Sequence, residues 1–89
     1  MKNARRDKVV IYGDLLSALN EEAKNERIVL THVQVKLNVA FDRLKKYLAV
    51  LKELELIEDE NSPRLTKKGK EYLEEYEKVL DFIKRMNLV

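Results

Sequence analysis

Residues 31–56 read THVQVKLNVAFDRLKKYLAVLKELEL and hold most of the information about the fold. The first part of this stretch predicts a short helix over about residues 32–37, and residues 38–40 predict a tight break. A longer amphipathic helix is predicted over about residues 41–54, because apolar residues recur there at helical spacing. The predicted buried stripe of this helix consists of Phe41, Leu44, Tyr47, Leu48 and Leu51.

A short β-hairpin is predicted after the second of these helices. The segments LIED at residues 56–59 and RLT at residues 64–66 flank a break that contains Pro63, which is tolerated at the start of an edge strand. The order helix, turn, helix, hairpin is typical of a winged helix-turn-helix, in which the second helix of the pair enters the major groove of DNA. The predicted fold class is therefore mostly α, with a small β-hairpin as the wing.

The start of the helix pair carries two further signals. The β-branched segment RIVL at residues 27–30 predicts a first short strand. Thr31 with Gln34 three residues later forms a capping box, which is expected to start the short helix.

Two long helices are predicted at the ends of the chain. The first covers about residues 5–24, and the second covers about residues 67–88 with Thr66 as its N-cap. Gly13 lies inside the first helix, where glycine costs about 1 kcal/mol relative to alanine, so we expect another helix to approach closely there. The predicted buried stripe of the first helix consists of Val9, Val10, Leu15, Leu16 and Leu19.

The composition excludes several classes of protein. The chain has 89 residues and no Cys, which predicts one small domain without disulfides, a thiolate metal site or a cysteine nucleophile. His32 is the single His, so no metal site is predicted, and we interpret it as a surface residue or a contact to a DNA phosphate. The sequence shows no Gly-rich phosphate loop, dinucleotide fingerprint or catalytic triad. We therefore expect neither an enzyme nor a cofactor.

The charges of the chain are unevenly distributed, although the net charge is only +2. Residues 1–8 hold four bases and one acid, residues 31–52 hold five bases and one acid, and residues 53–60 hold five acids and no base. No apolar run approaches the roughly 18 residues of a membrane span, and no secretion signal is evident, so we expect a cytoplasmic protein. The abundance of Lys and Glu hints at a thermophile.

Residues 31–48 resemble small archaeal winged-helix DNA-binding proteins that dimerise through a long C-terminal helix. The pattern T-R-I-M-Y-x-A-N-L-S-F-x-x-L-K-K-Y-L of that family aligns without a gap with T-H-V-Q-V-K-L-N-V-A-F-D-R-L-K-K-Y-L here. The resemblance implies a homodimer that binds double-stranded DNA without catalysis. Ala40 stands where the family has Ser, which removes a helix cap worth about 1 kcal/mol. Glu55 stands where the family has Gly, which predicts backbone strain in a left-handed conformation.

The basic residues of the second helix are the main candidates for DNA contacts. Arg43 and Lys46 lie one turn apart on its outer side, and Arg43 is the better candidate for a base because its planar guanidinium can bond guanine with two hydrogen bonds. Arg64 is expected in the wing, near a flanking minor groove. The competing interpretation is that these residues belong to solvated faces, and the acids of residues 58–60 disfavour contact of the hairpin tip with DNA. Candidate phosphate contacts are Arg5, Arg6, Lys8, Lys36, Lys45 and Lys52.

The last helix carries a heptad-like stripe that predicts a dimer interface. Its members are spaced by four and three residues: Tyr72, Tyr76, Val79, Ile83 and Met86. The competing interpretation is an intramolecular helix that lies along the first helix. We expect a winged helix-turn-helix domain over residues 1–66 and a coiled-coil-like dimerisation helix over residues 67–89.

The predicted function is binding of double-stranded DNA as a homodimer, either as a transcription regulator or as an architectural, nucleoid-associated protein. The alternative is a protein-interaction module with a winged-helix fold that does not contact DNA. The acidic hairpin favours that alternative, whereas the basic side of residues 41–54 favours DNA.

Overall fold

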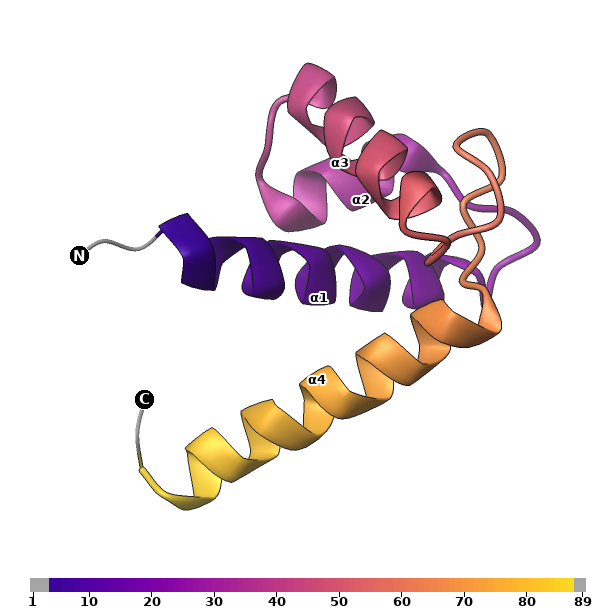
Figure 1. Ribbon diagram of the computed structural model, residues 1–89. Helices are drawn as coiled ribbons and strands as arrows, with labels where there is room; N and C mark the ends of the chain where they lie inside the picture. Colours follow the sequence, from indigo (N-terminus) through magenta and orange to yellow (C-terminus); the bar gives the residue numbers. More distant parts are fainter. Residues whose placement is uncertain (1–3, 88–89) are drawn as a thin grey trace.

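The computed structural model describes residues 4–87, and it describes side chains from residue 8 onward. These residues form four α-helices in the order that the sequence predicts, and Figure 1 shows α2 and α3 on one side of α1 and α4 on the other. The helices are α1 (Ala4–Glu22), α2 (Leu30–Leu37), α3 (Phe41–Glu53) and α4 (Lys67–Arg85). Their bounds agree with the predicted helices to within three residues at each end.

The break between α2 and α3 is built by one left-handed residue. Asn38 has φ 55° and ψ 50°, a conformation that Asn tolerates better than most residues. Its N–H donates to the carbonyl oxygens of Gln34 and Val35, and the N–H of Val39 donates to Gln34 as well. These bonds close the carboxyl end of α2 and turn the chain within three residues. Ala40 precedes α3 and provides no side-chain cap, as the comparison with the family pattern predicts.

The prediction of a strand over residues 27–30 and of a capping box is wrong. Leu30 is already helical, and the N-cap of α2 is Val29, which has no side-chain cap. Thr31 therefore lies inside the helix and cannot cap it. Glu22, at the end of α1, accepts a hydrogen bond from the Val29 N–H at 3.4 Å instead. A partner distant in sequence thus takes the place of the local cap, which is why the local pattern misleads.

The predicted hairpin is present only as a reduced wing, and within residues 4–87 no segment forms a strand. One isolated antiparallel bridge joins Ile57 and Leu65. The Glu58 N–H donates to the Arg64 carbonyl oxygen at 2.9 Å, and the Thr66 N–H donates to the Leu56 carbonyl oxygen at 3.1 Å. Because Ile57 and Leu65 are buried, these bonds anchor the wing to the core.

The core lies where α1, α2, α3, the first half of α4 and the base of the wing meet. Two members of the predicted stripes are exposed instead: Phe41 is 42% exposed and Val9 is 56% exposed. Phe41 is the first residue of α3, and Val9 lies in the first half of α1. The largest fully buried side chains are Leu15, Leu16, Leu19, Val33, Leu44, Leu48, Leu51, Ile57 and Pro63.

A compact junction joins the end of α3 to the start of α4. Glu55 has φ 64°, which is the left-handed conformation that would be strained for a residue with a Cβ. Thr66 Oγ1 donates to the Glu55 carbonyl oxygen at 2.6 Å and accepts from the Gly69 N–H at 3.0 Å, which confirms Thr66 as the N-cap of α4. A side chain at Gly69 would clash with the Leu56 carbonyl oxygen, so glycine allows α4 to start directly against the wing.

Helices α1 and α4 touch over the first half of α4 and diverge beyond it (Figure 1). A Cβ at Gly13 would lie 2.5 Å from Tyr76 Cδ2, which confirms the predicted close approach of another helix to this glycine. Tyr76 is buried, and its hydroxyl donates to Asp14 Oδ1 at 2.9 Å. The Tyr72 hydroxyl donates to the Val9 carbonyl oxygen at 3.0 Å. These contacts fix α4 against α1.

Candidate nucleic-acid interface

The outer side of α3 presents a group of exposed cations. Leu44, Leu48 and Leu51 are fully buried and fix the rotation of this helix, so the side of the helix opposite to them points to solvent. Arg43 and Lys46, three residues apart, are exposed neighbours on that side. Among the side chains of residues 8–87, neither forms an ion pair. No acid of the described part of the chain therefore lies within 4.0 Å of either charged group.

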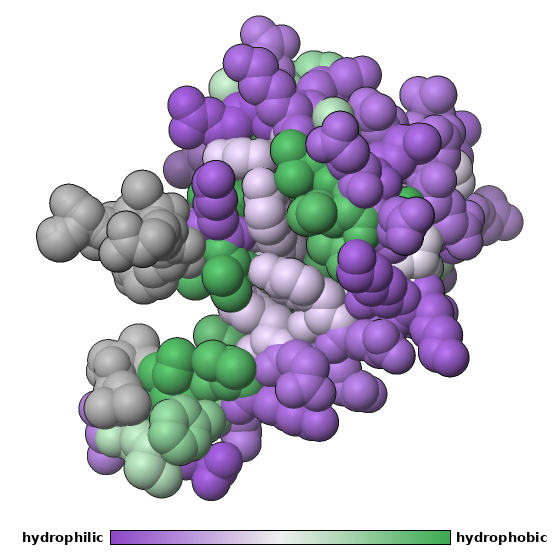
Figure 2. Space-filling view, viewed as in Figure 1, coloured by the Kyte–Doolittle hydropathy of each residue, from purple (hydrophilic) through white to green (hydrophobic). Residues whose placement is uncertain are grey.

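Lys45 lies on the flank of α3 beside an exposed aromatic ring. Its Nζ is 5.9 Å from the centroid of the Phe41 ring, which is within the range of a cation–π contact. Such a contact is worth about 0.5–1 kcal/mol at an exposed site. The amino-terminal end of α3 therefore combines a cation with an apolar surface. In Figure 2 the upper edge of the molecule, above α3, is mostly hydrophilic.

The other predicted phosphate contacts are distributed around α3. Lys36 is exposed in the last turn of α2, and Lys52 is exposed in the last turn of α3. At these positions each cation interacts favourably with the negative end of the helix dipole. Lys8 is exposed on α1. Arg5 and Arg6 lie in the first turn of α1, but their side chains are outside the described part of the structure.

The wing carries Arg64 beside acidic neighbours. Arg64 is exposed, as is Glu58, whereas Asp59 and Glu60 are half-buried. Arg64 lines a hollow of about 190 Å³ between the wing and the α1–α2 loop, together with Arg27. Sequence reasoning missed Arg27, because residues 27–30 were interpreted as a strand and not as part of a loop facing the wing.

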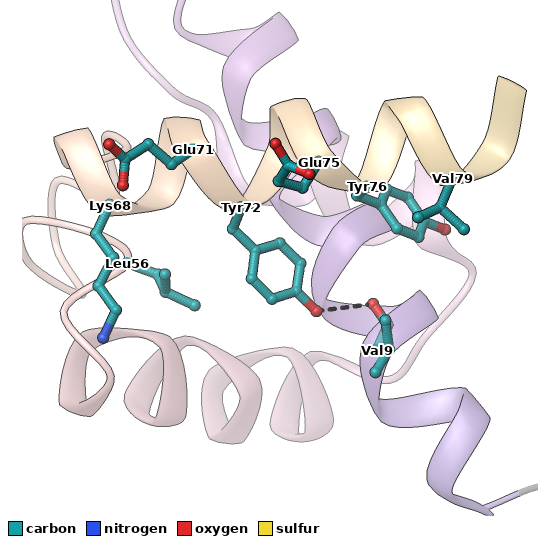
Figure 3. A pocket seen from close by; sticks show the side chains of 8 residues that line it. All are labelled: Val9, Leu56, Lys68, Glu71, Tyr72, Glu75, Tyr76 and Val79. Atoms are coloured by element: carbon teal, nitrogen blue, oxygen red, sulfur yellow. Dashed lines mark hydrogen bonds between the residues drawn. The ribbon is translucent and has the colours of Figure 1, made fainter. Parts of the chain in front are cut away.

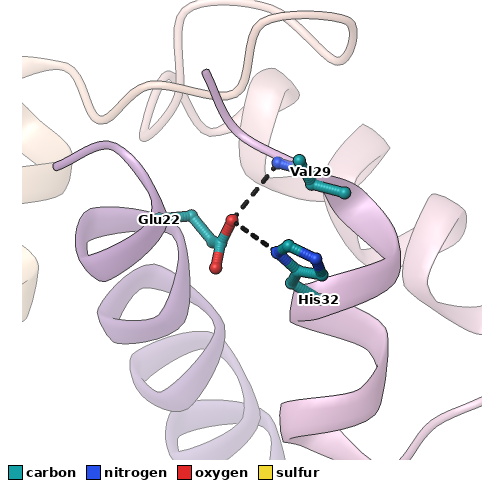
Figure 4. A network of polar contacts seen from close by, with 3 residues as sticks. All are labelled: Glu22, Val29 and His32. Atoms are coloured by element: carbon teal, nitrogen blue, oxygen red, sulfur yellow. Dashed lines mark hydrogen bonds and ion pairs between the residues drawn. The ribbon is translucent and has the colours of Figure 1, made fainter. Parts of the chain in front are cut away.

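Sequence reasoning also missed Glu22, the one buried charged residue among the described side chains. Its Oε1 accepts from the Val29 N–H at 3.4 Å and lies 3.3 Å from His32 Nδ1 (Figure 4). The carboxylate thus joins the end of α1 to the start of α2. His32 is on the surface of α2, as expected, but one of its ring nitrogens faces Glu22 and only the rest of the ring is available to solvent.

The residues of the predicted dimer interface divide into two groups. Tyr76 is buried and Tyr72 is half-buried within the subunit, where both contact α1. Val79 is 52% exposed and Met86 is 49% exposed, whereas Ile83 is half-buried. Their position in the second half of α4 leaves them without cover by α1. In Figure 2 hydrophobic side chains gather at this end of α4.

An apolar groove of about 450 Å³ runs between α1 and the first half of α4. Figure 3 shows Tyr72 pointing from α4 toward Val9 of α1, with Val79 at one end of the groove and Leu56 at the other. Glu71 and Glu75 also line it. The groove contains no buried polar group that could orient a small polar ligand, so its chemistry favours an apolar side chain.

No helix within residues 4–87 is long and apolar enough to cross a membrane. No group of three or more His, Asp or Glu side chains in that part of the chain is arranged to hold a metal ion.

A family described as winged helix-turn-helix matches residues 5–84, which include all of α2 and α3 and all but one residue each of α1 and α4. Neither a curated protein nor a solved structure matches the chain significantly.

Proposed function

The chain belongs to the winged helix-turn-helix family, and we propose that it binds double-stranded DNA by placing α3 in the major groove. Domains of this family are typically DNA-binding modules without catalytic activity. The observation that supports the proposal most directly is the exposed, unpaired pair of cations at Arg43 and Lys46 on the helix that follows the turn. Duplex DNA is a dense line of negative charge, so cations on a rigid helix release counterions from it.

The proposal assigns different roles to different cations. Arg43 contacts a base edge, since its guanidinium can donate two hydrogen bonds to guanine. Lys46 lies one turn further along the same side and reaches a base edge or a phosphate. The remaining residues contact phosphates and fix the orientation of the protein: Lys36, Lys45, Lys8, Arg5, Arg6 and Arg64.

We further infer that the DNA-bound form is a homodimer joined through α4. Three apolar side chains of α4 support this inference because they are exposed at positions i, i+3 and i+7 of one stripe: Val79, Phe82 and Met86. The groove beside α1 continues this stripe, since Val79 also lines it. Glu71 and Glu75 line the groove together with Lys68, whereas Lys84 and Arg85 lie in the last turn of α4. An antiparallel pair of α4 helices would bring these opposite charges together.

A second candidate function is a protein-interaction module without DNA contact. The apolar groove between α1 and α4 and the acidic residues 58–60 favour it. The two functions differ in their dependence on salt. A DNA-binding protein loses affinity steeply as the salt concentration rises, by about 0.9 in the logarithmic slope for each phosphate contact. A docking module retains duplex weakly at most.

Replacement of Arg43 tests the proposed function. Arg43→Ala is expected to weaken binding of a preferred duplex by about 1–3 kcal/mol and to reduce the discrimination between duplex sequences, because a base contact is lost. The measurement is fluorescence anisotropy of labelled genomic and random duplexes over a salt series. Lys78→Ala, an exposed change on α4, is the control. If the folded wild-type chain ignores duplex DNA at low salt, the proposed function is wrong.

The same measurement separates the possible biological roles. A transcription regulator binds selected genomic sequences much more tightly than random duplexes, whereas an architectural, nucleoid-associated protein binds both alike. Equal loss of affinity on all sequences in Arg43→Ala would assign this residue to a phosphate.

A further inference from the structure

We propose that Phe41, the first residue of α3, determines part of the sequence specificity by contacting the methyl group of a thymine in the major groove. Phe41 is a large apolar side chain that the fold leaves exposed. Its role depends on α3 being the helix in the groove, so this inference rests on the proposed function. It adds an apolar base contact to the contacts of the cations.

Phe41 continues the apolar stripe of α3 beyond the point where the core covers it. Leu44 and Leu48, about one and two turns further along the helix, are fully buried, whereas Phe41 is 42% exposed. In Figure 1 α3 begins at the upper edge of the molecule, on the side away from α4. The ring therefore lies at an end of the helix that another molecule can reach.

The residues just before Phe41 leave this end of the helix open and apolar. Ala40 is exposed, and as the N-cap of α3 it provides no side-chain hydrogen bond. Val39 is half-buried and packs against the core. Neither residue carries a polar side chain that would hold water over the ring. The backbone that carries Phe41 is fixed, because the N–H of Leu44 donates to the Ala40 carbonyl oxygen at 3.0 Å.

The charges beside the ring favour a base edge over a phosphate at this end of α3. Asp42, the next residue, is an exposed acid in the first turn, and phosphates repel its carboxylate. Lys45 lies on the other side of Phe41, with its Nζ 5.9 Å from the ring centroid. The ring is thus placed between an acid that avoids the DNA backbone and a cation that is attracted to it.

The chemistry of the major groove identifies the base that an exposed phenyl ring would select. In helix-turn-helix proteins the amino-terminal residues of the second helix contact the base edges. Thymine presents a methyl group in the major groove, whereas the edges of the other standard bases present only hydrogen-bonding atoms there. Contact between the ring and this methyl group removes apolar surface of both partners from water. Phe41 therefore favours thymine at the position that it faces.

Duplexes that differ only in the thymine methyl group test the proposal. One pool of genomic fragments is amplified with either thymidine or deoxyuridine triphosphate, so the sequences and the hydrogen-bonding edges of the bases stay the same. Fluorescence anisotropy should show that the wild type binds the thymine pool about fourfold more tightly, the factor expected for burial of one methyl-sized group. Phe41→Ala should bind both pools alike. Phe41→Leu, which keeps an apolar side chain, and the control Lys78→Ala on α4 should retain the preference.

The outcomes separate this inference from the proposed function. A wild type that binds both pools equally well overturns the thymine contact and leaves the proposed function intact, whereas a folded wild type that binds neither pool refutes the proposed function. A preference for thymine that persists in Phe41→Ala, shown by circular dichroism to be folded, overturns Phe41 as its source. Tighter binding of a third pool that contains 5-methylcytosine, without a difference between the first two, would assign the contact to methylated cytosine and overturn thymine.

Discussion

Glu55 adopts a left-handed conformation at the end of α3 that closes this helix. With φ 64° it directs its own N–H to the Lys52 carbonyl oxygen and the Leu56 N–H to the Leu51 carbonyl oxygen, at 2.9 and 2.8 Å. This is the hydrogen-bond pattern of a Schellman motif, which usually has Gly at the left-handed position. A residue with a Cβ costs about 1–2 kcal/mol in this conformation. Thr66 stabilises the strained residue by donating to its carbonyl oxygen.

Replacement of Glu55 by glycine should therefore stabilise the protein. Glu55→Gly keeps the backbone hydrogen bonds and removes the Cβ, so we expect a gain of about 1 kcal/mol after the larger unfolded-state entropy of glycine is subtracted. A change of this size corresponds to a rise in Tm of about 4–8 °C for a domain of this length. Thermal and denaturant unfolding at one fixed protein concentration measure it. Glu55→Ala, which removes the charge but keeps the Cβ, is the control, and an equal rise in both variants would contradict the role of strain.

Single residues were predictable from the sequence where their cause is local or steric. Gly13 and Thr66 are examples. A glycine inside a helix indicates that another element approaches closely there, and a Thr just before a helix can accept a hydrogen bond from a free N–H of the first turn. Thr31 and Arg27 were misinterpreted, since the signals at these positions depend on partners elsewhere in the chain. Glu22 is the partner at the start of α2, and the wing is the partner of Arg27. A short-range sequence pattern does not indicate either of these contacts.

At the scale of elements, the contact between α1 and α4 is held by a polar bond inside an apolar surface. The Tyr76 ring covers Gly13, and its hydroxyl donates to Asp14. Burial raises the pKa of Tyr76 to about 12, and the hydrogen bond to Asp14 adds to this effect. Burial also raises the pKa of Tyr72, which donates to the Val9 carbonyl oxygen. Both tyrosines are therefore bound to α1 as neutral phenols.

The contact between α1 and α4 is expected to weaken at alkaline pH. Because the folded-state pKa of Tyr76 exceeds the ordinary value of 10, its contribution to stability is complete below pH 10 and is lost as the pH rises from 10 to about 12. Denaturant unfolding at a series of pH values should show this loss in the wild type. Tyr76→Phe, which has no ionisable hydroxyl, should show a smaller loss over the same interval. An identical pH dependence in both proteins would exclude the tyrosine as its cause.

The four helices were predictable from the sequence, whereas the predicted strands do not form within residues 4–87. Apolar spacing defines α1, α3 and α4 over many residues, so an error at one position does not displace them. The wing has few residues, and its single bridge between Ile57 and Leu65 is defined by burial against the core and not by alternation. The outer cations of α3 were predictable because they follow from the rotation of the helix. The hollow that Arg27 and Arg64 line together was not predictable, since it joins segments that are separate in the sequence.

At the scale of the whole molecule, the exposed end of α4 is the main feature that the single subunit does not explain. Val79, Phe82 and Met86 are about half exposed and lie where α4 diverges from α1. Tyr72 and Tyr76, which belong to the predicted stripe, already contact α1 within the subunit. The proposed dimer interface therefore moves toward the carboxyl-terminal half of α4. A two-fold dimer through it would present two copies of α3 to one duplex, ideally about 34–36 Å apart.

A charged residue in this stripe should separate the two subunits. Val79→Glu places a carboxylate among apolar side chains, so we expect light scattering to give the mass of a monomer where the wild type gives that of a dimer. Duplex affinity should fall as well, because two linked copies of α3 bind more tightly than one. Lys78→Gln changes the charge by the same amount on an exposed position beside the stripe and should remain dimeric. A wild-type chain that is monomeric at every concentration, with unchanged DNA binding by Val79→Glu, would show that α4 serves only its own subunit.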